Sequence, residues 1–245
     1  MKEFAKRLLG PIFYRLHNRN RGTQMELKFW DKWVADKCEG VWGDEFERRF
    51  NPETEVRGHH QEILDLYYSA GMSILDVGSG PVSNIGYQYN GNKLDLTASD
   101  PNADAYNKLL DSNNLMPPVR TTRASGESLS SDFSQEFDWV NCDNALDHAV
   151  DPNNALQEMV KVLKPGGVIS LFHEIDEGVN EGYRGYHKWN LCPIGTNGFA
   201  IWDPNQRREY IDEFKGLKIT TSIRDDRFLV VMKADVEESS NLRAA

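Results

Sequence analysis

The sequence predicts an α/β fold in which an N-terminal helical extension precedes a doubly wound, mostly parallel sheet of seven strands that ends in an antiparallel hairpin. Two observations predict it. Between residues 72 and 172, short apolar runs alternate with helix-like stretches, a pattern typical of a parallel sheet with right-handed crossovers. Near the C-terminus, only Arg224-Asp225-Asp226 separates two further strand-like runs, and strands joined by so short a turn must be antiparallel.

The strands are expected where apolar or β-branched residues run between turn signals. They are Met72–Val77, Leu94–Ser99, Val119–Arg123, Phe137–Cys142, Val168–Phe172, Leu217–Ile223 and Arg227–Met232. Helices are expected over residues 83–90, 103–112, 152–163 and 204–214. The last two begin at Asp151-Pro152 and Asp203-Pro204, and such a pair is typical of an N-cap followed by proline in the first helical turn.

Composition and hydrophobic patterning divide the chain into an extension, a main domain and a tail. Residues 24–70 are rich in aromatics, and Ile63–Tyr67 before Gly71 suits an amphipathic helix with a glycine stop, so residues 1–70 are expected to form a helical extension. Residues 71–234 form the main domain. Within it, residues 174–202 show no clear strand and are predicted to be a lid loop over the substrate. The polar residues 235–245 are predicted to be a disordered tail.

Charge and cysteine usage exclude several classes of protein. The net charge of −10 argues against a nucleic-acid binder. Residues 1–21 hold six Lys or Arg against one Glu, and two interpretations stay open for them: peripheral contact with an anionic membrane, at its inner face, or packing on the domain or on a partner subunit such as a second copy. No apolar run is long enough to span a membrane, no signal peptide is visible, and three scattered cysteines form no disulfide or metal pattern. These features predict a cytoplasmic protein.

A glycine turn and a distant aspartate predict a nucleoside site. The first strand runs into Asp76-Val77-Gly78-Ser79-Gly80, where the glycines let a ligand approach the backbone closely. Asp100 ends the second strand twenty residues after Gly80, where a carboxylate can accept hydrogen bonds from a ribose. Ser83 replaces the third glycine of a dinucleotide fingerprint, and the charge of Asp76 disfavours a pyrophosphate. Both features count against the alternative of an NAD-dependent oxidoreductase.

Three segments in order resemble the class I S-adenosylmethionine-dependent methyltransferases, particularly their small-molecule, type 11-like members. They are the glycine turn, the run Phe137–Val140 followed by Asn144–His148 and Asp151-Pro152, and the run Val162–Gly167. The resemblance covers residues 74–172. It implies a Rossmann-like fold, S-adenosylmethionine as the cofactor and methyl transfer to a small polar acceptor. A non-catalytic scaffold subunit that keeps the cofactor fold is the alternative from another class.

The resemblance also implies which residues bind the cofactor. Asp76, Gly78, Ser79 and Gly80 would surround its methionine part, Asp100 and Pro101 its ribose, Ser125, Gly126 and Glu127 its adenine, and Cys142 with Asp143 again the methionine part. Ser125 stands where the family often has an aspartate that accepts from the adenine amino group. That contact is therefore expected to be weaker or to come from the backbone.

Methyl transfer to a hydroxyl needs a general base, and histidine is suited to that role. The candidates are His173, which follows the fifth strand, and Asp147 with His148, which follow the fourth; structural roles remain the alternative for each. Asp143, Asp147 and His148 could hold a divalent metal ion, but the remaining ligands are not apparent, so no metal is expected.

The aromatic and polar residues of the expected lid loop suit an acceptor with hydroxyls and ring faces, such as a saccharide or glycan. The substrate-binding candidates are Tyr186, His187, Trp189 and Asn190. The alternative is that these aromatics only pack on the N-terminal helices. The sequence therefore predicts an O-methyltransferase acting on a saccharide-related hydroxyl.

Overall fold

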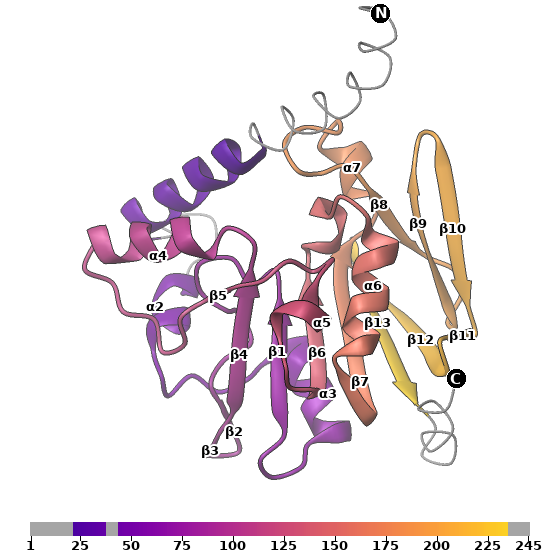
Figure 1. Ribbon diagram of the computed structural model, residues 1–245, viewed down its shortest axis with the longest axis horizontal. Coiled ribbons are helices and arrows are strands. Elements are labelled where there is room, and N and C mark those ends of the chain that lie inside the picture. The colour runs from indigo at the N-terminus through magenta and orange to yellow at the C-terminus, as the bar shows by residue number, and fades with distance from the viewer. Residues whose placement is uncertain (1–21, 38–43, 235–245) are drawn as a thin grey trace, which may run out of the picture.

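An eight-stranded mixed sheet forms the centre of the molecule (Figure 1). The computed structural model describes residues 22–37 and 44–234. The strand order is β11-β12-β13-β7-β6-β1-β4-β5. The strands are β1 (Ser73–Val77), β4 (Asp95–Asp100), β5 (Thr122–Arg123), β6 (Phe137–Asp143), β7 (Leu163–Glu174), β11 (Glu213–Phe214), β12 (Leu217–Arg224) and β13 (Arg227–Ala234).

The pairing directions confirm the predicted α/β class. Strands β7, β6, β1, β4 and β5 are parallel, and β13 and β12 add an antiparallel hairpin beside β7. The eighth strand, β11, is two residues long and antiparallel to β12, and seven strands were expected because so short a strand has no periodicity to detect.

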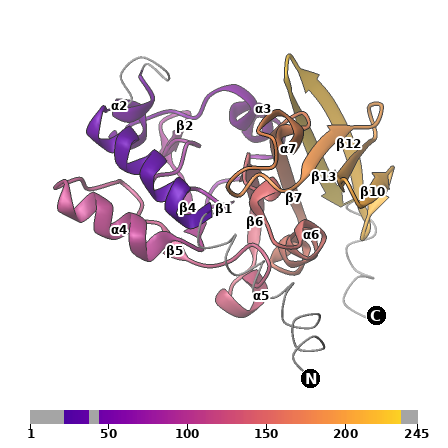
Figure 2. The ribbon, with the colours of Figure 1, turned by 90° about the horizontal axis from the view of Figure 1, so that it is seen from above.

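Helices cover both faces of this sheet. Helix α3 (Gly58–Tyr67) lies on one face, and α5 (Leu129–Asp132) and α6 (Pro152–Lys161) lie on the other (Figure 2). The predictions of helices over 103–112 and 152–163 are confirmed by α4 (Ala103–Ser112) and α6. The carboxylate of Asp151 accepts from the amides of Asn153 and Asn154, as the N-cap prediction requires.

The described part of the N-terminal extension packs on the main domain. Its helical residues 22–35 lie beside α4, and the rings of Trp30 and Tyr106 are 6.3 Å apart (Figure 2). Helix α2 (Glu45–Phe50) adds Phe46, which packs on Trp33 in the same buried cluster. The extension thereby covers the β4 side of the sheet and comes close to the strand ends where a ligand is expected.

The predicted helix over 83–90 is wrong, because the chain there pairs with the N-terminal segment instead. The amide of Tyr87 donates to the carbonyl of Thr54, and the amide of Val56 donates to the carbonyl of Gln88. Gly86 has a φ of +106°, and a Cβ there would lie 3.1 Å from the carbonyl oxygens of Thr54 and Glu55. The segment ends in a short hairpin of β2 (Gln88–Tyr89) and β3 (Asn92–Lys93).

The predicted helix over 204–214 is also wrong, and the expected lid loop is more ordered than predicted. Strands β8 (Asn190–Pro193), β9 (Gly198–Asp203) and β10 (Gln206–Ile211) form a separate three-stranded antiparallel sheet. Phe199 and Tyr210 of this sheet belong to the same buried cluster as Ile219 of β12. Apart from the hairpin turn at 194–197, residues 175–189 remain as an irregular connection, interrupted by the short helix α7 (Glu177–Asn180).

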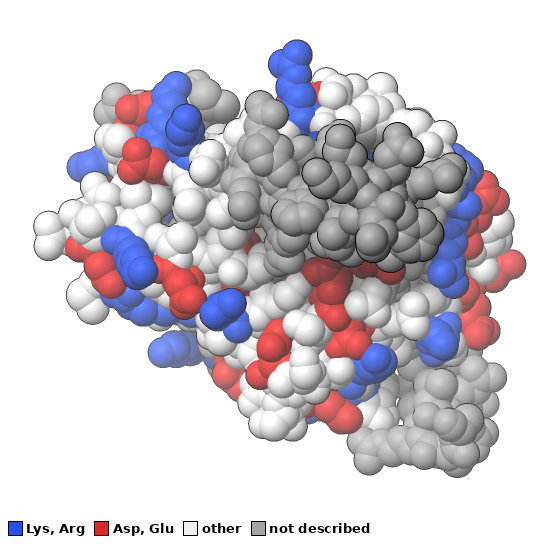
Figure 3. Space-filling model, turned by 45° about the horizontal axis from the view of Figure 1, so that its top comes forward, with Lys and Arg blue, Asp and Glu red and all other residues white. Residues whose placement is uncertain are grey.

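Two predictions fall outside the residues that the structure describes. They are the membrane or partner contact of residues 1–21 and the disordered tail of residues 235–245. Within the described residues, the helices are all too short or too polar to cross a membrane. On the face seen in Figure 3, acidic and basic side chains are intermixed over the described surface.

Candidate active site

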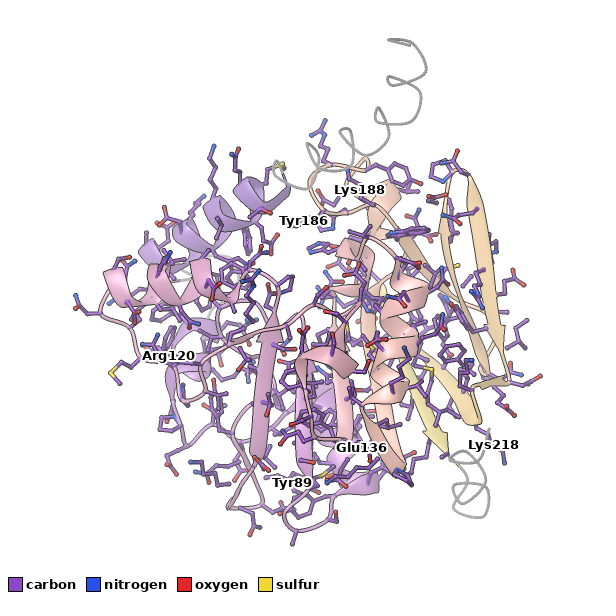
Figure 4. All side chains as sticks on the ribbon, in the orientation of Figure 1. Tyr89, Arg120, Glu136, Tyr186, Lys188 and Lys218 are labelled. Carbon is purple, nitrogen blue, oxygen red and sulfur yellow. The ribbon has the colours of Figure 1, made fainter. Side chains whose placement is uncertain are left out.

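A cavity of about 1240 Å³ lies at the carboxyl ends of the parallel strands. Loops after β1, β4, β5 and β6 form its floor, and helical residues 22–35, α2, the first turn of α3 and residues 177–189 form its walls. Figure 4 shows Tyr186 and Lys188 at this end of the sheet, whereas Tyr89 and Glu136 lie at the opposite end. The position agrees with the rule that open α/β sheets bind ligands beyond the carboxyl ends of their strands.

The glycine turn after β1 needs its glycines for two reasons. Gly78 and Gly80 have φ values of +74° and +65°, which L side chains rarely adopt. A Cβ at Gly78 would lie 2.4 Å from Cβ of Ala145, and one at Gly80 would lie 2.8 Å from the indole of Trp30. The turn is therefore tightly enclosed between the loop after β6 and the N-terminal helix.

Asp100 is a buried carboxylate on the cavity wall. Its Oδ1 accepts from the amide of Asn102 at 2.7 Å and its Oδ2 from the amide of Gly80 at 3.3 Å. A carboxylate has about four acceptor positions, so these bonds leave capacity for two ribose hydroxyls. Burial raises the pKa of Asp100 to about 7, and the charges of Glu26 and Asp76 add to the rise.

All of the residues predicted to contact the cofactor line this cavity. They are Asp76, Gly78, Ser79, Gly80, Asp100, Pro101, Ser125, Gly126, Glu127, Cys142 and Asp143. The structure thus brings together four loops that are far apart in the sequence. Which of these residues bind the cofactor stays a prediction.

The carboxylates of two of these residues accept hydrogen bonds from neighbouring residues of the protein. The carboxylate of Asp76 accepts from Oγ of Ser83 at 2.7 Å and from Nδ2 of Asn141 at 3.0 Å, and burial raises its pKa to about 6. Glu127 accepts from Oγ of Ser125 at 2.6 Å and from the amide of Val150 at 2.6 Å. These carboxylates therefore shape the loops around the cavity.

His173 and Asn190 do not lie where the sequence analysis expected them. His173 is 1% exposed and does not line the cavity, and burial lowers its pKa to about 4. Its neighbours Phe172 and Glu174 line the cavity, so the alternation of a strand turns His173 to the other face. Asn190 is fully buried, accepts from the amide of Val179 and donates to Oη of Tyr183, which makes it a structural residue of the lid.

A histidine pair that the sequence analysis missed stands at the cavity instead. Nε2 of His59 lies 3.0 Å from Oδ2 of Asp143, and Nε2 of His60 lies 3.1 Å from the same oxygen. Nδ2 of Asn84 also donates to Oδ2 of Asp143, at 2.9 Å. Burial works against ionisation of Asp143, but the charges of His60 and His59 hold its pKa well below the usual range. The adjacent histidines at the start of an expected helix were the signal that could have found this site.

A second cluster joins the predicted residues Asp147 and His148 to the predicted substrate residue His187. Oδ2 of Asp147 lies 2.8 Å from Nδ1 of His187, and Nε2 of His148 lies 3.1 Å from that same nitrogen. Oε1 of Glu177 lies 3.4 Å from it. Burial and the charge of Asp147 raise the pKa of Glu177 to about 8. His148, His187, Tyr186 and Trp189 all line the cavity, and Asp147 is fully buried behind them.

Arginines of α2 bring positive charge to the wall opposite this cluster. Glu45 pairs with Arg48 and Arg49 at 3.0 Å and with Arg57 at 2.5 Å, so a single carboxylate faces three guanidinium groups. All four side chains line the cavity. Nη1 of Arg48 is buried and has no hydrogen-bond partner among the described residues. This wall therefore carries three guanidinium groups against the single carboxylate of Glu45.

Comparison with known proteins identifies the chemistry for which this cavity is built. A family model described as a methyltransferase domain matches residues 75–171, which include the glycine turn, Asp100, Cys142 and Asp143. Residues 75–171 form a methyltransferase domain, and the chain is an S-adenosylmethionine-dependent methyltransferase. Its cofactor is S-adenosylmethionine, and the residues present fit that group, because a buried, hydrogen-bonded carboxylate and a glycine turn face one cavity. The oxidoreductase and scaffold alternatives are set aside.

Curated relatives of this methyltransferase act on different atoms. It is 29% identical over 208 residues to the ubiquinone/menaquinone biosynthesis C-methyltransferase UbiE of Rickettsia felis, which covers 82% of this chain and 75% of the relative. It is 27% identical over 127 residues to the thiol S-methyltransferase TMT1B of Mus musculus, over 51% of this chain and 52% of that protein. Among solved structures, a methyltransferase from Clostridium acetobutylicum is similar over 84% of this chain and 98% of its own, with 14% identity and a TM-score of 0.47.

Proposed function

We propose that this methyltransferase O-methylates a small, polar, hydroxyl-bearing acceptor, namely a saccharide or a glycan-related molecule. The observation that supports the proposal is a carboxylate-supported histidine, His59 on Asp143, in the wall of the cofactor cavity. An alcohol is a poor nucleophile until its proton is removed, so an enzyme that methylates hydroxyls needs such a base close to the transferred group.

The chain's own residues hold the cofactor in this proposal. S-adenosylmethionine, when bound, supplies a methyl group on a positively charged sulfur. Asp100 accepts from the ribose hydroxyls, and the glycine turn leaves room for the chain that joins ribose to methionine. The acidic residues around the cavity, Asp76 and Asp143 among them, make the site favourable for a positively charged ligand. Positioning supplies a large part of the rate in this kind of displacement.

His59 takes the acceptor proton in this proposal. Because Asp143 accepts from Nε2 of His59, the ring carries its hydrogen on Nε2 and keeps a lone pair on Nδ1. The ring stacks on Phe172 with centroids 3.9 Å apart, and this contact fixes its orientation. His59 replaces His173 as the proposed base, since His173 lies outside the cavity.

The acceptor side of the cavity combines flat rings with polar groups. Tyr186, His187 and Trp189 line one wall, as the sequence analysis proposed for a saccharide, and Arg48 and Asn84 line another. Sugars present both apolar ring faces and many hydroxyls, and sites of mixed aromatic and hydrogen-bonding character suit them. The buried, unpartnered Nη1 of Arg48 favours an acceptor that also carries an oxygen-rich or acidic group.

A second candidate is methylation at carbon, which the similarity to UbiE over 208 residues favours. The two candidates differ in the bond that forms, oxygen to methyl in one and carbon to methyl in the other.

The product distinguishes them. The enzyme is incubated with S-adenosylmethionine labelled in the methyl group and with panels of saccharides, uronic acids, phenols and thiols, and the labelled product is analysed by NMR. A methyl ether on a sugar supports the proposal; label on a ring carbon or on sulfur alone overturns it.

A further inference from the structure

The cluster around His187 has too few hydrogens for the acceptor atoms that converge on it. Nδ1 of His187 lies 2.8 Å from Oδ2 of Asp147, 3.1 Å from Nε2 of His148 and 3.4 Å from Oε1 of Glu177. A neutral imidazole carries one hydrogen, and that hydrogen can make one well-aligned bond from this nitrogen. Oε1 of Glu177 also accepts from Nδ2 of Asn144 at 3.0 Å, so the competition for the hydrogen on His187 is between Oδ2 of Asp147 and Nε2 of His148.

Buried oxygens in the same cluster are unsatisfied. Oδ1 of Asp147 and Oε2 of Glu177 have no hydrogen-bond partner within the part of the chain that the structure describes. Asp147 is fully buried and Glu177 is 7% exposed. A buried carboxylate oxygen without a partner is costly, so the pair indicates that something beyond these residues satisfies it.

We propose that Asp147, His148 and His187 bind a divalent transition-metal ion, with Glu177 as a further ligand. The three ligand atoms lie within 4.8 Å of one another, at separations of 2.8, 3.1 and 3.5 Å. Metal–ligand bonds of 2.0–2.1 Å place neighbouring ligand atoms about 3.0 Å apart at right angles and about 3.4 Å apart in a tetrahedron. The observed separations match that range, and a cation would compensate the buried charge of Asp147.

The donor set favours zinc or a similar ion over magnesium or calcium. Two imidazoles and carboxylate oxygens suit zinc, iron or cobalt, whereas magnesium and calcium prefer oxygen ligands alone. The sequence offers Asp147 and His148 as metal ligands, but no metal was expected because the remaining ligands, His187 and Glu177, are about 30 to 40 residues away in the chain. Only the folded lid brings them together.

The other histidine cluster is a useful contrast. Both oxygens of Asp143 are satisfied there, Oδ1 by His59 at 3.1 Å and Oδ2 by His59 and Asn84 at 3.0 and 2.9 Å. An amide hydrogen of Asn84 points at the oxygen that a metal would have to take. Nε2 of His60, 3.1 Å from Oδ2 of Asp143, has no hydrogen-bond partner among the described residues, but neither oxygen of Asp143 is left unpaired. The two clusters therefore differ in their carboxylates, and His59 supplies the control for the metal site.

The position of the proposed ion suggests its task. His148, His187 and Glu177 line the cavity next to Tyr186, so open positions on the ion would face the acceptor side. An ion there would bind an acceptor oxygen and lower the pKa of a bound hydroxyl. This role rests on the proposed function, whereas the metal site itself does not.

Metal binding is tested without an activity assay. The full chain is stripped with a chelator and titrated with Zn²⁺ by calorimetry, and then with Co²⁺ by visible absorption. We expect one tightly bound ion per chain and a Co²⁺ spectrum of a site with nitrogen ligands. His187→Ala and Asp147→Asn should each weaken Zn²⁺ binding by about 100-fold or more, because loss of an outer-sphere partner alone costs 10–100-fold. His59→Ala should leave it unchanged.

Thermal unfolding and the affinity for S-adenosylhomocysteine show whether each variant is folded, and Asp147→Asn preserves shape if His187→Ala does not fold. Zn²⁺ should also raise the unfolding temperature of the wild type but not of the folded variants. Absence of a stoichiometric Zn²⁺ site in the wild type, or its loss in His59→Ala alone, overturns the proposal. If the protein binds the metal ion but forms no methyl ether, the result would contradict only the proposed acceptor.

Discussion

The buried carboxylate of Asp100 makes cofactor affinity depend on pH. In the ligand-free protein its pKa is raised to about 7, first by burial and then by the charges of Glu26 and Asp76. A ribose that donates two hydrogen bonds to this group requires the ionised form. Affinity should therefore be constant above pH 7 and should fall as the pH drops through 7, because the proton must leave before the ribose can bind.

The expected loss of cofactor affinity follows from the raised pKa of Asp100. One pH unit below the ligand-free pKa costs tenfold in affinity, which is about 1.4 kcal/mol. At pH 5, two units below a pKa of about 7, the dissociation constant should be about 100-fold higher than at pH 8, provided that the ribose bonds hold the bound pKa below 5. Asp76, with a pKa of about 6, titrates in the same cavity and adds to the loss below pH 6.

The assay is calorimetric titration with S-adenosylhomocysteine between pH 5 and 8. Methylthioadenosine, which has the same ribose without the amino-acid part, separates Asp100 from groups that bind methionine. In Asp100→Asn the affinity should be much lower and the slope between pH 6 and 8 should disappear. Equal affinity of the wild type at pH 5.5 and pH 8 would refute the ribose assignment.

The pH dependence of folding stability tests the ionisation of Asp100 independently of ligand binding. A carboxyl whose folded pKa is raised destabilises the folded state increasingly as the pH rises from the unfolded pKa towards the folded one. For Asp100 that window runs from the ordinary aspartate pKa of 3.8 to about 7. Ligand-free Asp100→Asn should therefore gain stability relative to the wild type on going from pH 5 to pH 8. A difference that does not change with pH would show that Asp100 is not the titrating group.

Three further substitutions have defined outcomes. His59→Gln should lower the methylation rate by about 100-fold or more, as loss of a general base does, with S-adenosylhomocysteine affinity unchanged; a normal rate would assign the base elsewhere. Gly78→Ala should abolish cofactor binding because of its φ of +74° and the 2.4 Å approach to Ala145, and unchanged calorimetry would contradict this account of the turn. Asp151→Ala should cost about 1 kcal/mol of unfolding free energy in urea through loss of the α6 cap, whereas Asp151→Asn should cost much less; equal losses would argue against capping.

The sequence predicted the parts of the fold that depend on local patterns. Strand positions, α4, α6 and the cofactor loops came from apolar runs, glycines and an N-cap, and each of those signals acts within a few residues. All of the predicted cofactor residues line the cavity for the same reason, since each one lies at the carboxyl end of a parallel strand or in the loop that follows it.

The failures arose where the same local signal has two structural outcomes. Asp151 and Asp203 both precede proline, and both carboxylates accept from the amides two and three residues later. After Asp151 the chain continues as α6, but after Asp203 it turns back and pairs with β9. Tertiary pairing decided between helix and hairpin, and a single sequence does not contain that information locally.

The candidate site shows the same limit. Asp143 and Asp147 were visible as polar residues after a strand, but their histidine partners arrive from α3 and from the lid. His173 failed because strand alternation places it opposite its cavity-lining neighbours. Contacts between distant segments, which decide which side chain is a base and which is structural, need the folded chain.

The most direct test of the account is a crystal structure of the enzyme with S-adenosylhomocysteine. Hydrogen bonds require the two ribose hydroxyls to lie within about 3 Å of the carboxylate of Asp100, and the sulfur should face the cavity wall that carries His59 and Asp143. A ligand bound away from the glycine turn, or a ribose with no contact to Asp100, would contradict the central claim.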